Sequence, residues 1–408
     1  MADCIVPEGY KKTLLGVIPK EWKVKRLEFL CSNKGDYGIN APAVTYSKDL
    51  PTYLRITDID DDGRFITVNK TSVNSSNSEN FHLQEGDIVF ARTGATVGKT
   101  YLYNPNDGDL VFAGFLIRFS PDIQKIIPSF LRAYTNTSIY WNWVKIISQR
   151  SGQPGINAAE YCSLQIPVPP LKEQQKIVKI LSVWDKAIEK QTQLIEKLEL
   201  RKKGLIQQLL TGKKRLPGFS GEWKKVKAGL LFGSSSIRSN KLEPLLSVTQ
   251  DKGVVPRDML ETRVTMPNGD LSSFKLVDVG DFVISLRSFE GGLEYSKYRG
   301  IVSPAYTVLK KKTDLSDVFY KVYFKSNDFI QRLAVAVIGI RDGKQISYSD
   351  FCYIKIPYPS LQEQNAIANV FVSCDNEILL AKHKLNSFQQ QKKGLMQVLL
   401  TGKKRVTL

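Results

Sequence analysis

IPVPPLKEQ, at residues 166–174, returns as IPYPSLQEQ at residues 356–364, so this chain repeats part of itself at an offset of 190 residues. Residues 161–215 and 351–405 align without gaps and are identical at 22 of 55 positions. Both segments end on the same seven residues, LLTGKKR, at 209–215 and 399–405. A repeat of this length indicates a duplicated architecture.

A second pair of matching segments lies upstream of each long repeat. Residues 15–23 align with residues 216–224 and share Leu, Glu, Trp and Lys at an offset of 201. The two offsets differ by 11, so the region between the matches is 11 residues longer in the first copy. There the copies diverge, and their clearest shared point is a Gly-Asp pair, at Gly86-Asp87 and Gly280-Asp281. The chain therefore has the order variable, constant, variable, constant.

Each constant segment has the periodicity of a long helix. Apolar residues alternate at spacings of four and three, which is the heptad seam of a coiled coil. Prolines precede each segment and prevent an earlier helix start, and a glycine follows the last seam residue. The seams comprise Ile177, Leu181, Trp184, Ile188, Ile195, Leu198, Leu205 and Leu209 in the first copy, and Ile367, Phe371, Cys374, Ile378, Leu385, Phe388, Leu395 and Leu399 in the second.

About 40 helical residues at ~1.5 Å each give a rod of roughly 60 Å whose apolar stripe needs a partner. We predict that the two long helices form an antiparallel intramolecular coiled coil with pseudo-two-fold symmetry. The alternative is that each helix packs on its own globular domain. Lys202 and Lys392 occupy the same seam position. They either fix the register of the coiled coil or extend to solvent, and we favour the second.

The variable segments contain short β-branched and aromatic runs broken by Gly, Pro, Asn and Asp, with few helical signals. We therefore expect an α+β chain in which two globular domains of mixed α/β type are joined by the two long helices. The expected order is an N-terminal conserved segment (1–23), a first globular domain (24–165), a central conserved helix region (166–215), a second globular domain (216–355) and a C-terminal conserved helix region (356–408).

Composition favours a polyanionic partner. The net charge is +18 and the pI is about 9.5, and each Lys or Arg placed on a phosphate releases condensed counterions. The five cysteines are scattered singly, which is typical of reduced thiols in a cytoplasmic protein. No apolar run is long enough to span a bilayer, and we expect a cytoplasmic protein without a signal peptide.

A glycine-rich loop, ARTGATVGKT at residues 91–100, follows a strand-like run. It is one residue short of the P-loop spacing, and no helix pattern follows it, so nucleotide hydrolysis is not expected. Its backbone amides and Lys99 suit phosphate, while Arg92 suits phosphate or a guanine edge, with Thr93 beside it. The alternative is a plain β-hairpin with a solvated tip. In the second copy, Arg287 and Ser288 lie at the related place.

A second pair of loops precedes the prolines. Arg and Gln side chains hydrogen-bond guanine and adenine through two atoms each, so these loops are candidates for base contacts. The alternative, which is compatible, is a helix-to-strand linker capped by Asn157 and Ser347. The candidate residues are Arg150, Ser151 and Gln153 in the first copy and Arg341, Lys344 and Gln345 in the second.

We expect no active site, cofactor or metal in this chain. There are only two histidines, and neither lies in a catalytic constellation. No adenine-methyltransferase motif and no G-x-G-x-x-G opening a helix is present. The run Asp60-Asp61-Asp62 resembles a metal site, but we interpret it as a solvated turn that the second copy lacks.

The order of these parts resembles the specificity (S) subunit of type I restriction–modification enzymes, over nearly the whole chain. The resemblance rests on the Pro-Leu-x-Glu-Gln segments at 166–177 and 356–367, the two LLTGKKR segments, the Ile18–Trp22 segment and the loop at 92–99.

This resemblance implies that each variable segment is a target-recognition domain that reads half of a split, asymmetric double-stranded DNA sequence. The coiled coil would act as a ruler that fixes the unread spacer. Two methyltransferase (modification) subunits would dock on the conserved helices, and restriction/translocase subunits would add cleavage. S-adenosylmethionine, ATP and magnesium are then expected on those partners, which supply the adenine-N6 methyltransferase and ATP-dependent endonuclease activities. The alternative is a coiled-coil scaffold with non-specific nucleic-acid-binding domains.

Overall fold

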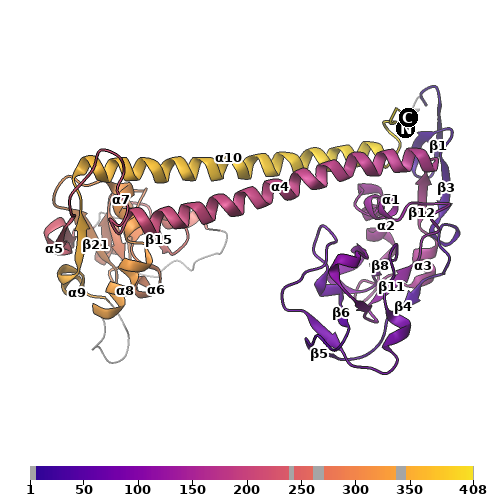
Figure 1. Cartoon of the computed structure of the whole chain (residues 1–408), viewed down its shortest axis with the longest axis horizontal. Helices are drawn as coiled ribbons and strands as arrows, with labels where there is room; N and C mark the ends of the chain where they lie inside the picture. Colours follow the sequence, from indigo (N-terminus) through magenta and orange to yellow (C-terminus); the bar gives the residue numbers. More distant parts are fainter. Residues whose placement is uncertain (1–5, 239–242, 261–270, 337–345, 408) are drawn as a thin grey trace. The chain divides into compact units, whose positions relative to one another are not determined.

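The computed structural model describes residues 6–238, 243–260, 271–336 and 346–407 (Figure 1). The chain divides into two compact units. Unit 1 comprises Met1–Thr192 and Lys384–Leu408, and unit 2 comprises Gln193–His383. Each unit therefore contains one globular domain and a part of both long helices. No helix in the described ranges is long and apolar enough to cross a membrane.

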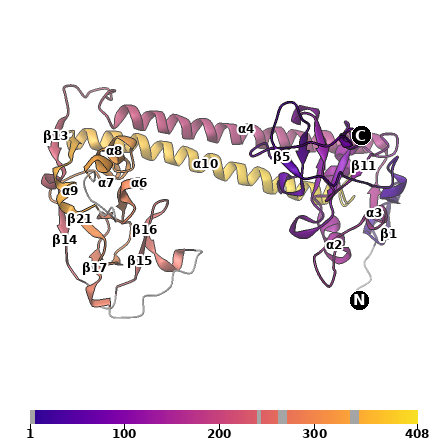
Figure 2. The same cartoon turned by 90° about the horizontal axis from the view of Figure 1, so that it is seen from below.

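Two helices of 39 residues each, α4 (Leu171–Leu209) and α10 (Leu361–Leu399), confirm the predicted long helices. Figures 1 and 2 show them side by side. Gly212 and Gly402, just beyond their last residues, have φ values of +69° and +73°. This left-handed conformation ends a helix and is readily adopted by glycine.

Each residue of the predicted seam is buried or half-buried, and the seam residues near the helix ends also pack into the core of a globular domain. In unit 1 the ring of Trp184 packs edge-on against Phe388, with 5.8 Å between ring centroids. The first part of α4 thus faces the last part of α10. In unit 2 a later part of α4 faces an earlier part of α10, because Glu199 Oε1 of α4 lies 2.7 Å from Lys382 Nζ of α10. The helices are therefore antiparallel, as predicted.

The seam lysines do not simply extend to solvent. Lys202 Nζ lies 2.5 Å from Asp375 Oδ1 in unit 2, and Lys392 Nζ lies 2.5 Å from Asp185 Oδ1 in unit 1. Our preference for solvated lysines was wrong in this respect, since each ammonium group ends on an aspartate of the facing helix. The two pairs are related by the 190-residue offset, and they fit the register that the repeat predicts.

The globular part of unit 1 is built from small sheets and three short helices. Two four-stranded sheets, β10-β6-β7-β5 and β4-β11-β8-β9, carry most of its core, and β12-β3 and β1-β2 form two-stranded pairs. The bounds are β1 Tyr10–Thr13, β2 Gly16–Pro19, β3 Lys23–Arg26, β4 Asp36–Tyr37, β5 Ala43–Thr45, β6 Thr52–Leu54, β7 Thr71–Val73, β8 Ile88–Ala91, β9 Thr100–Leu102, β10 Leu110–Phe112, β11 Leu116–Phe119, α1 Pro128–Tyr134, α2 Ser138–Ile147, α3 Ala158–Cys162 and β12 Gln165–Val168.

Unit 2 repeats this plan with shorter sheets. Its four-stranded sheet is β14-β21-β18-β19, and β13-β22, β15-β16 and β17-β20 are two-stranded. The bounds are β13 Lys224–Lys227, α5 Ala228–Leu231, β14 Phe232–Ser235, β15 Leu246–Thr249, β16 Gly253–Pro256, β17 Lys275–Val277, β18 Phe282–Ile284, α6 Ser288–Gly291, β19 Glu294–Tyr295, β20 Gly300–Val302, β21 Thr307–Lys311, α7 Asp317–Tyr323, α8 Asn327–Ala336, α9 Tyr348–Tyr353 and β22 Lys355–Tyr358. The predicted α+β class is confirmed.

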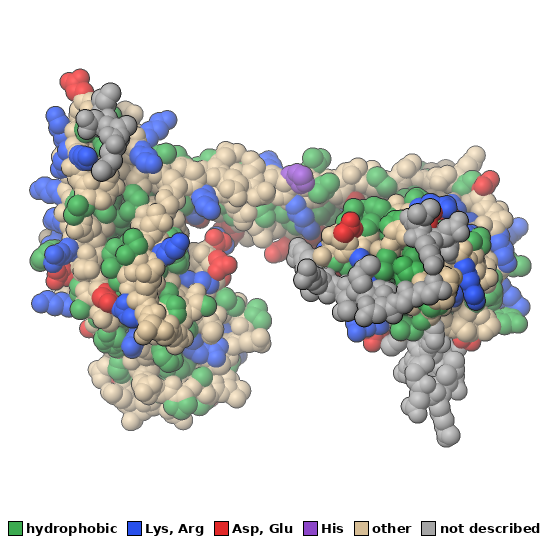
Figure 3. Space-filling view, turned by 180° about the vertical axis from the view of Figure 1, so that it is seen from behind, with side chains coloured by type: hydrophobic (Ala, Val, Ile, Leu, Met, Phe, Trp, Pro, Cys, Tyr) green, Lys and Arg blue, Asp and Glu red, His purple; other side chains and the backbone are tan. Residues whose placement is uncertain are grey.

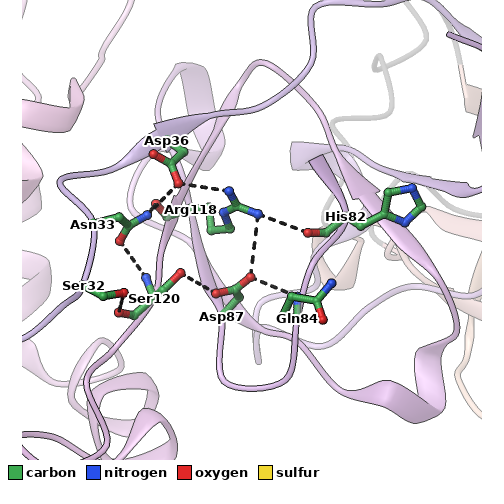
Figure 4. Close-up of polar contacts among 8 residues, drawn as sticks. All are labelled: Ser32, Asn33, Asp36, His82, Gln84, Asp87, Arg118 and Ser120. Carbon is green, nitrogen blue, oxygen red and sulfur yellow. Dashed lines mark hydrogen bonds and ion pairs between the residues drawn. The ribbon is translucent and has the colours of Figure 1, made fainter. Parts of the chain in front are cut away.

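The Gly-Asp pair of unit 1 belongs to a buried polar network (Figure 4). The Asp87 carboxylate accepts hydrogen bonds from Gln84 N at 2.9 Å and Ser120 Oγ at 2.6 Å. Arg118 of β11 lies 3.9 Å from the same carboxylate and donates to Asp36 at 3.0 Å. The network ties β8, β11 and β4 together.

Unit 2 has the same arrangement with a different cation. Asp281 Oδ2 accepts from Asp278 N at 2.8 Å and lies 2.8 Å from Lys310 Nζ of β21. Burial raises the pKa of Asp281, whereas Lys310 lowers the pKa of Asp278. A buried aspartate that closes a turn and meets a cation on the neighbouring strand is thus a structural node of both globular domains.

The Glu-Gln pair of each constant segment fixes the start of its long helix. In unit 1, Glu173 is fully buried and accepts from Trp22 Nε1 at 3.1 Å and Arg405 Nη2 at 2.9 Å. The neighbouring Gln174 accepts from the backbone N of Ile127 at 2.8 Å, which attaches α4 to the segment before α1. We call Glu173, Trp22 and Arg405 the closure cluster of unit 1.

Unit 2 has its own closure cluster, made of Glu363, Trp223 and Arg215. Glu363 Oε2 accepts from Trp223 Nε1 at 2.9 Å and Arg215 Nη2 at 2.7 Å. Gln364 accepts from Ser316 N at 2.9 Å. The Pro-Leu-x-Glu-Gln repeat is therefore a structural motif, in which the glutamate and the glutamine bind the same kinds of partner in both units.

Candidate nucleic-acid interface

The two predicted loops of unit 1 meet, although about 60 residues of sequence separate them. Ile156 N donates to Arg92 O at 2.9 Å, and Gly94 N donates to Pro154 O at 2.9 Å. Thr93 and Gly155 form an isolated antiparallel bridge between these bonds. Residues 91–98 and 149–157 thus form one continuous edge of the domain.

Arg92 is held from several sides within this edge. Its backbone N donates to Phe115 O at 3.0 Å, and its Nη1 lies 3.4 Å from Gly114 O. Its guanidinium also lies over the ring of Tyr37, 4.8 Å from the ring centroid. Such a cation–π contact restricts a long side chain to a defined position. Arg92 is therefore a positioned hydrogen-bond donor rather than a loose surface cation.

Tyr37 and Phe115 were not among the predicted site residues. Tyr37 is 42% exposed and Phe115 is 57% exposed, at the turn between β10 and β11. Phe115 stands in an apolar, strand-like stretch that predicts burial, whereas Tyr37 stands between two glycines. The only local signal is the Ala113-Gly114-Phe115 turn, because a glycine before an aromatic residue at a strand end is compatible with an exposed ring.

Arg150, Ser151 and Gln153 are all exposed on the same edge. Arg150 is already paired, because its Nη2 lies 2.5 Å from Glu160 Oε1. Gln153 covers Gly94, where an added Cβ would lie 2.9 Å from Gln153 Nε2. Gly94 has a φ of +72°, a left-handed conformation that favours glycine.

Lys99 is less available than we expected. Its Nζ lies 2.6 Å from Asp61 Oδ1, and this pairing lowers the pKa of the Asp61 carboxyl. The preceding Gly98 packs on α2, where an added Cβ would lie 2.7 Å from Val144. A phosphate on Lys99 would have to compete with Asp61.

In unit 2, the predicted residues Arg287 and Ser288 differ in exposure. Arg287 is exposed, whereas Ser288 is 1% exposed and its Oγ accepts from Ser285 N at 2.8 Å. Ser288 therefore shapes the turn before α6, and we no longer place its side chain in an interface. Arg341, Lys344 and Gln345 lie outside the described residues.

Unit 2 contains a concave polar surface that the sequence did not indicate. A cavity of about 530 Å³ is lined by residues of β15, the β15–β16 turn, the segment after β16 and the β20–β21 turn, among them Thr249, Lys252, Arg257 and Tyr306. Figure 3 shows Lys and Arg side chains on the surfaces of both units. Among the described residues, no group of His, Cys, Asp or Glu is arranged to hold a metal ion.

Comparison with known proteins agrees with this architecture. Residues 19–200 match the family described as the type I restriction modification DNA specificity domain. A putative type I restriction enzyme MjaX specificity subunit of Methanocaldococcus jannaschii is 28% identical, over 98% of this chain and 97% of the relative. The MjaVIII specificity subunit of the same organism is 26% identical, over 95% and 94% of the two chains.

Solved structures share the fold. A chain described under complex assembly and conformational transition of the type I R-M system has a TM-score of 0.61 at 17% identity, over 95% of this chain and 99% of that chain. The HsdS subunit from Thermoanaerobacter tengcongensis has a TM-score of 0.52 at 17% identity, over 95% and 98% of the two chains. Residues 19–200 thus match the type I restriction modification DNA specificity domain, and nearly the whole chain, with its duplicated closure clusters and antiparallel helices, is similar to type I restriction enzyme specificity subunits.

Proposed function

We propose that this chain is the DNA-reading subunit of a type I restriction–modification enzyme and recognises a bipartite target, one half with each globular domain. The observation that carries the proposal is the edge in unit 1 where loops 91–98 and 149–157 meet. It presents Arg92, Arg150 and Gln153 together, which are residue types that contact base edges and phosphates.

The divergence of the two units supports an asymmetric target. Phe90 pairs with Ile117 in unit 1, and Ile284, three residues after the Asp of its own Gly-Asp pair as Phe90 is, pairs with Thr307 in unit 2. Two residues further along the chain stand Arg92 in unit 1 and Leu286 in unit 2. Two domains with different residues at the same place in the sheet are suited to different half-sites.

We propose that the chemistry belongs to partner subunits. Two methyltransferase subunits, bound to the conserved helices, would bring S-adenosylmethionine, and restriction subunits would bring ATP and magnesium. The conserved helices suit this role because their seams and closure clusters are duplicated, so that each unit offers the same frame. The helix pair would then set the length of the unread spacer.

The test is to map N6-methyladenine in the host genome with and without this gene. Loss of one bipartite, asymmetric motif is the expected result. If no motif disappears, or if the lost motif is continuous and palindromic, the two-reader proposal is wrong. Equal affinity of the purified chain for all duplexes, with a steep salt dependence, would instead favour the non-specific scaffold.

A matched pair of variants tests the interface itself. Arg92→Ala should relax the half-site at one position, which corresponds to about 1–3 kcal/mol of discrimination. Arg64→Ala removes an exposed arginine of the same unit that lies outside both loops, and it should leave the sequence preference unchanged. Competition assays with single-base variants of the mapped target measure both effects.

A further inference from the structure

We propose that Arg92 and Phe115 form one base-reading element, in which Arg92 hydrogen-bonds a guanine and Phe115 contacts the 5-methyl group of a neighbouring thymine. The inference rests on the proposed function and goes further, since it names the chemical groups that unit 1 reads. It also predicts that these two bases are adjacent.

The first step concerns the exposure of Phe115. Its neighbours Phe112 and Leu116 are fully buried, whereas Phe115 is 57% exposed. The turn that carries it is fixed, because Gly114 N donates to Ile39 O and Leu116 N donates to Ala113 O, both at 2.8 Å. Because this rigid turn holds the Phe115 ring in solvent, the ring contributes little hydrophobic free energy to folding. Such a ring is suited to an external apolar contact.

The second step concerns the hydrogen-bonding capacity of Arg92. Among the described residues, no carboxylate lies within ion-pair distance of its guanidinium, whereas Arg118 and Arg150 pair with Asp36 and Glu160. The Tyr37 ring holds one face of the guanidinium, and the Tyr37 hydroxyl accepts from Ala158 N at 3.1 Å. Apart from the Nη1 group that donates to Gly114 O at 3.4 Å, the N–H groups in the plane of the guanidinium remain for a ligand, and guanine O6 and N7 match their spacing.

The third step concerns the relative position of the two side chains. The pairing of strands β8 and β11 ends at Ala91 and Leu116, and one backbone hydrogen bond, from Arg92 N to Phe115 O, joins the next residue on each side. Cross-strand neighbours project to the same face with Cβ atoms ~5 Å apart. Stacked bases of one strand are ~3.4 Å apart, so two such side chains can contact adjacent bases. In the major groove an arginine identifies guanine and an apolar group identifies the thymine methyl.

The element is confined to unit 1. The Gly-Asp pairs align Phe90 with Ile284, whose partners are Ile117 and Thr307, so the pair in unit 2 that corresponds to Arg92 and Phe115 is Leu286 and Ala305. Leu286 has no guanidinium, and Ala305 has no ring. Only one of the two half-sites should therefore depend on a thymine methyl group read next to a guanine.

The experiment uses the full chain and duplexes of the target found by methylation mapping. Each thymine of the target is replaced in turn by deoxyuridine, which lacks the 5-methyl group, and affinity is measured by fluorescence anisotropy. We expect one position, in one half-site only, where the replacement weakens binding by about fourfold, the value of one buried methyl group. At that position Phe115→Ala should bind both duplexes equally, and Phe115→Leu should still prefer thymine.

Phe29→Ala is the matched control, because Phe29 is 59% exposed in the same unit and lies in another turn, Leu27–Phe29. It should keep the wild-type preference for thymine. A second arm replaces each guanine by 7-deazaguanine, which lacks the N7 acceptor. The guanine next to the sensitive thymine should matter to the wild type and not to Arg92→Ala.

Two outcomes would overturn this inference alone: a mapped bipartite target at which deoxyuridine has no effect at any thymine, or a Phe115→Ala variant that still distinguishes the two bases. A sensitive thymine with no guanine beside it would overturn the pairing of Phe115 with Arg92. If no bipartite target exists, the proposed function fails first.

Discussion

The two closure clusters contain the same side chains, but the chain connects them differently. In unit 2, Arg215 and Trp223 lie eight residues apart and converge on Glu363. In unit 1, the partners of Glu173 are Trp22 and Arg405, which lie at opposite ends of the sequence. Unit 1 is therefore closed by contacts alone where unit 2 has a covalent connection. The same cluster geometry therefore forms whether or not a short chain segment connects the arginine to the tryptophan. This independence can be tested.

The largest expected effect concerns oligomeric state. A chain ended after Arg215 contains Trp22, Glu173 and Arg215, together with an α4 seam that has lost its α10 partner. Because the two seams share one register, we expect two such fragments to pair antiparallel, with Arg215 of each copy taking the place of Arg405 in the other. Size-exclusion chromatography with light scattering should report a dimer.

The charge reversal Arg215→Glu in that fragment is the control, since it places two carboxylates together and should weaken the dimer. A wild-type fragment that is folded and monomeric would show that the two clusters are not interchangeable. The full-length chain carrying the same reversal should keep the oligomeric state of the wild-type chain.

The next effect concerns the two tryptophans. Trp22 is fully buried and belongs to a core cluster with Ile18 and Leu400, whereas Trp223 is only half-buried. Trp22→Ala should destabilise unit 1 by about 3–5 kcal/mol, the usual cost of deleting a large buried aromatic side chain. Trp223→Ala should cost unit 2 less. Hydrogen exchange, followed separately for peptides of each unit during urea titration, measures the difference; equal losses would contradict it.

A smaller effect distinguishes the two arginines. Arg405→Ala and Arg215→Ala each leave a buried glutamate without its cation, at about 1–3 kcal/mol apiece. Only in unit 1 does the loss also release a chain end. Trypsin should therefore cut Arg405→Ala at Lys403 and Lys404 faster than it cuts the wild-type chain there. It should cut Arg215→Ala at Lys213 and Lys214 less readily than it cuts Arg405→Ala at Lys403 and Lys404. Faster cleavage at the unit 2 site would reverse this interpretation.

The same contrast explains which features were predictable from the sequence. The two helices, their antiparallel pairing and their register follow from the ungapped repeat, because two heptad seams in the same register can bury each other's apolar residues. The role of Glu173 was not predictable, since Trp22 and Arg405 are brought to it only by the fold. The repeat did signal it, because Trp22 and Trp223 are aligned at the offset of 201, and Glu173 with Glu363 and Arg215 with Arg405 are aligned at the offset of 190.

The geometry of the candidate interface was predictable only in part. Arg92 and Gln153 were candidates because their residue types indicate base contacts, and the fold brings their loops together; their contact with DNA stays a prediction. The burial of Ser288 was not predicted, because burial of a small polar residue in a turn has no local signature. The exposure of Phe115 was not predicted either, since an aromatic residue between strands predicts a core position. Exposure depends on the turn geometry, and that geometry depends on distant segments such as Ile39.

The smallest expected effect concerns the seam lysines. Asp375 and Asp185 are 58% and 45% exposed in the pairs they form with Lys202 and Lys392. Each pair should contribute only about 0.5 kcal/mol, and less at high salt. Lys392→Ala should therefore lower the urea midpoint of unit 1 slightly at low salt, and Lys202→Ala should do the same for unit 2. The double exchange of Lys392→Asp with Asp185→Lys should restore most of the loss. If a single replacement lowers the free energy of unfolding several times more than this, and salt does not change the loss, then the lysines fix the register of the coiled coil. The helix alignment in both units would then depend on these two pairs.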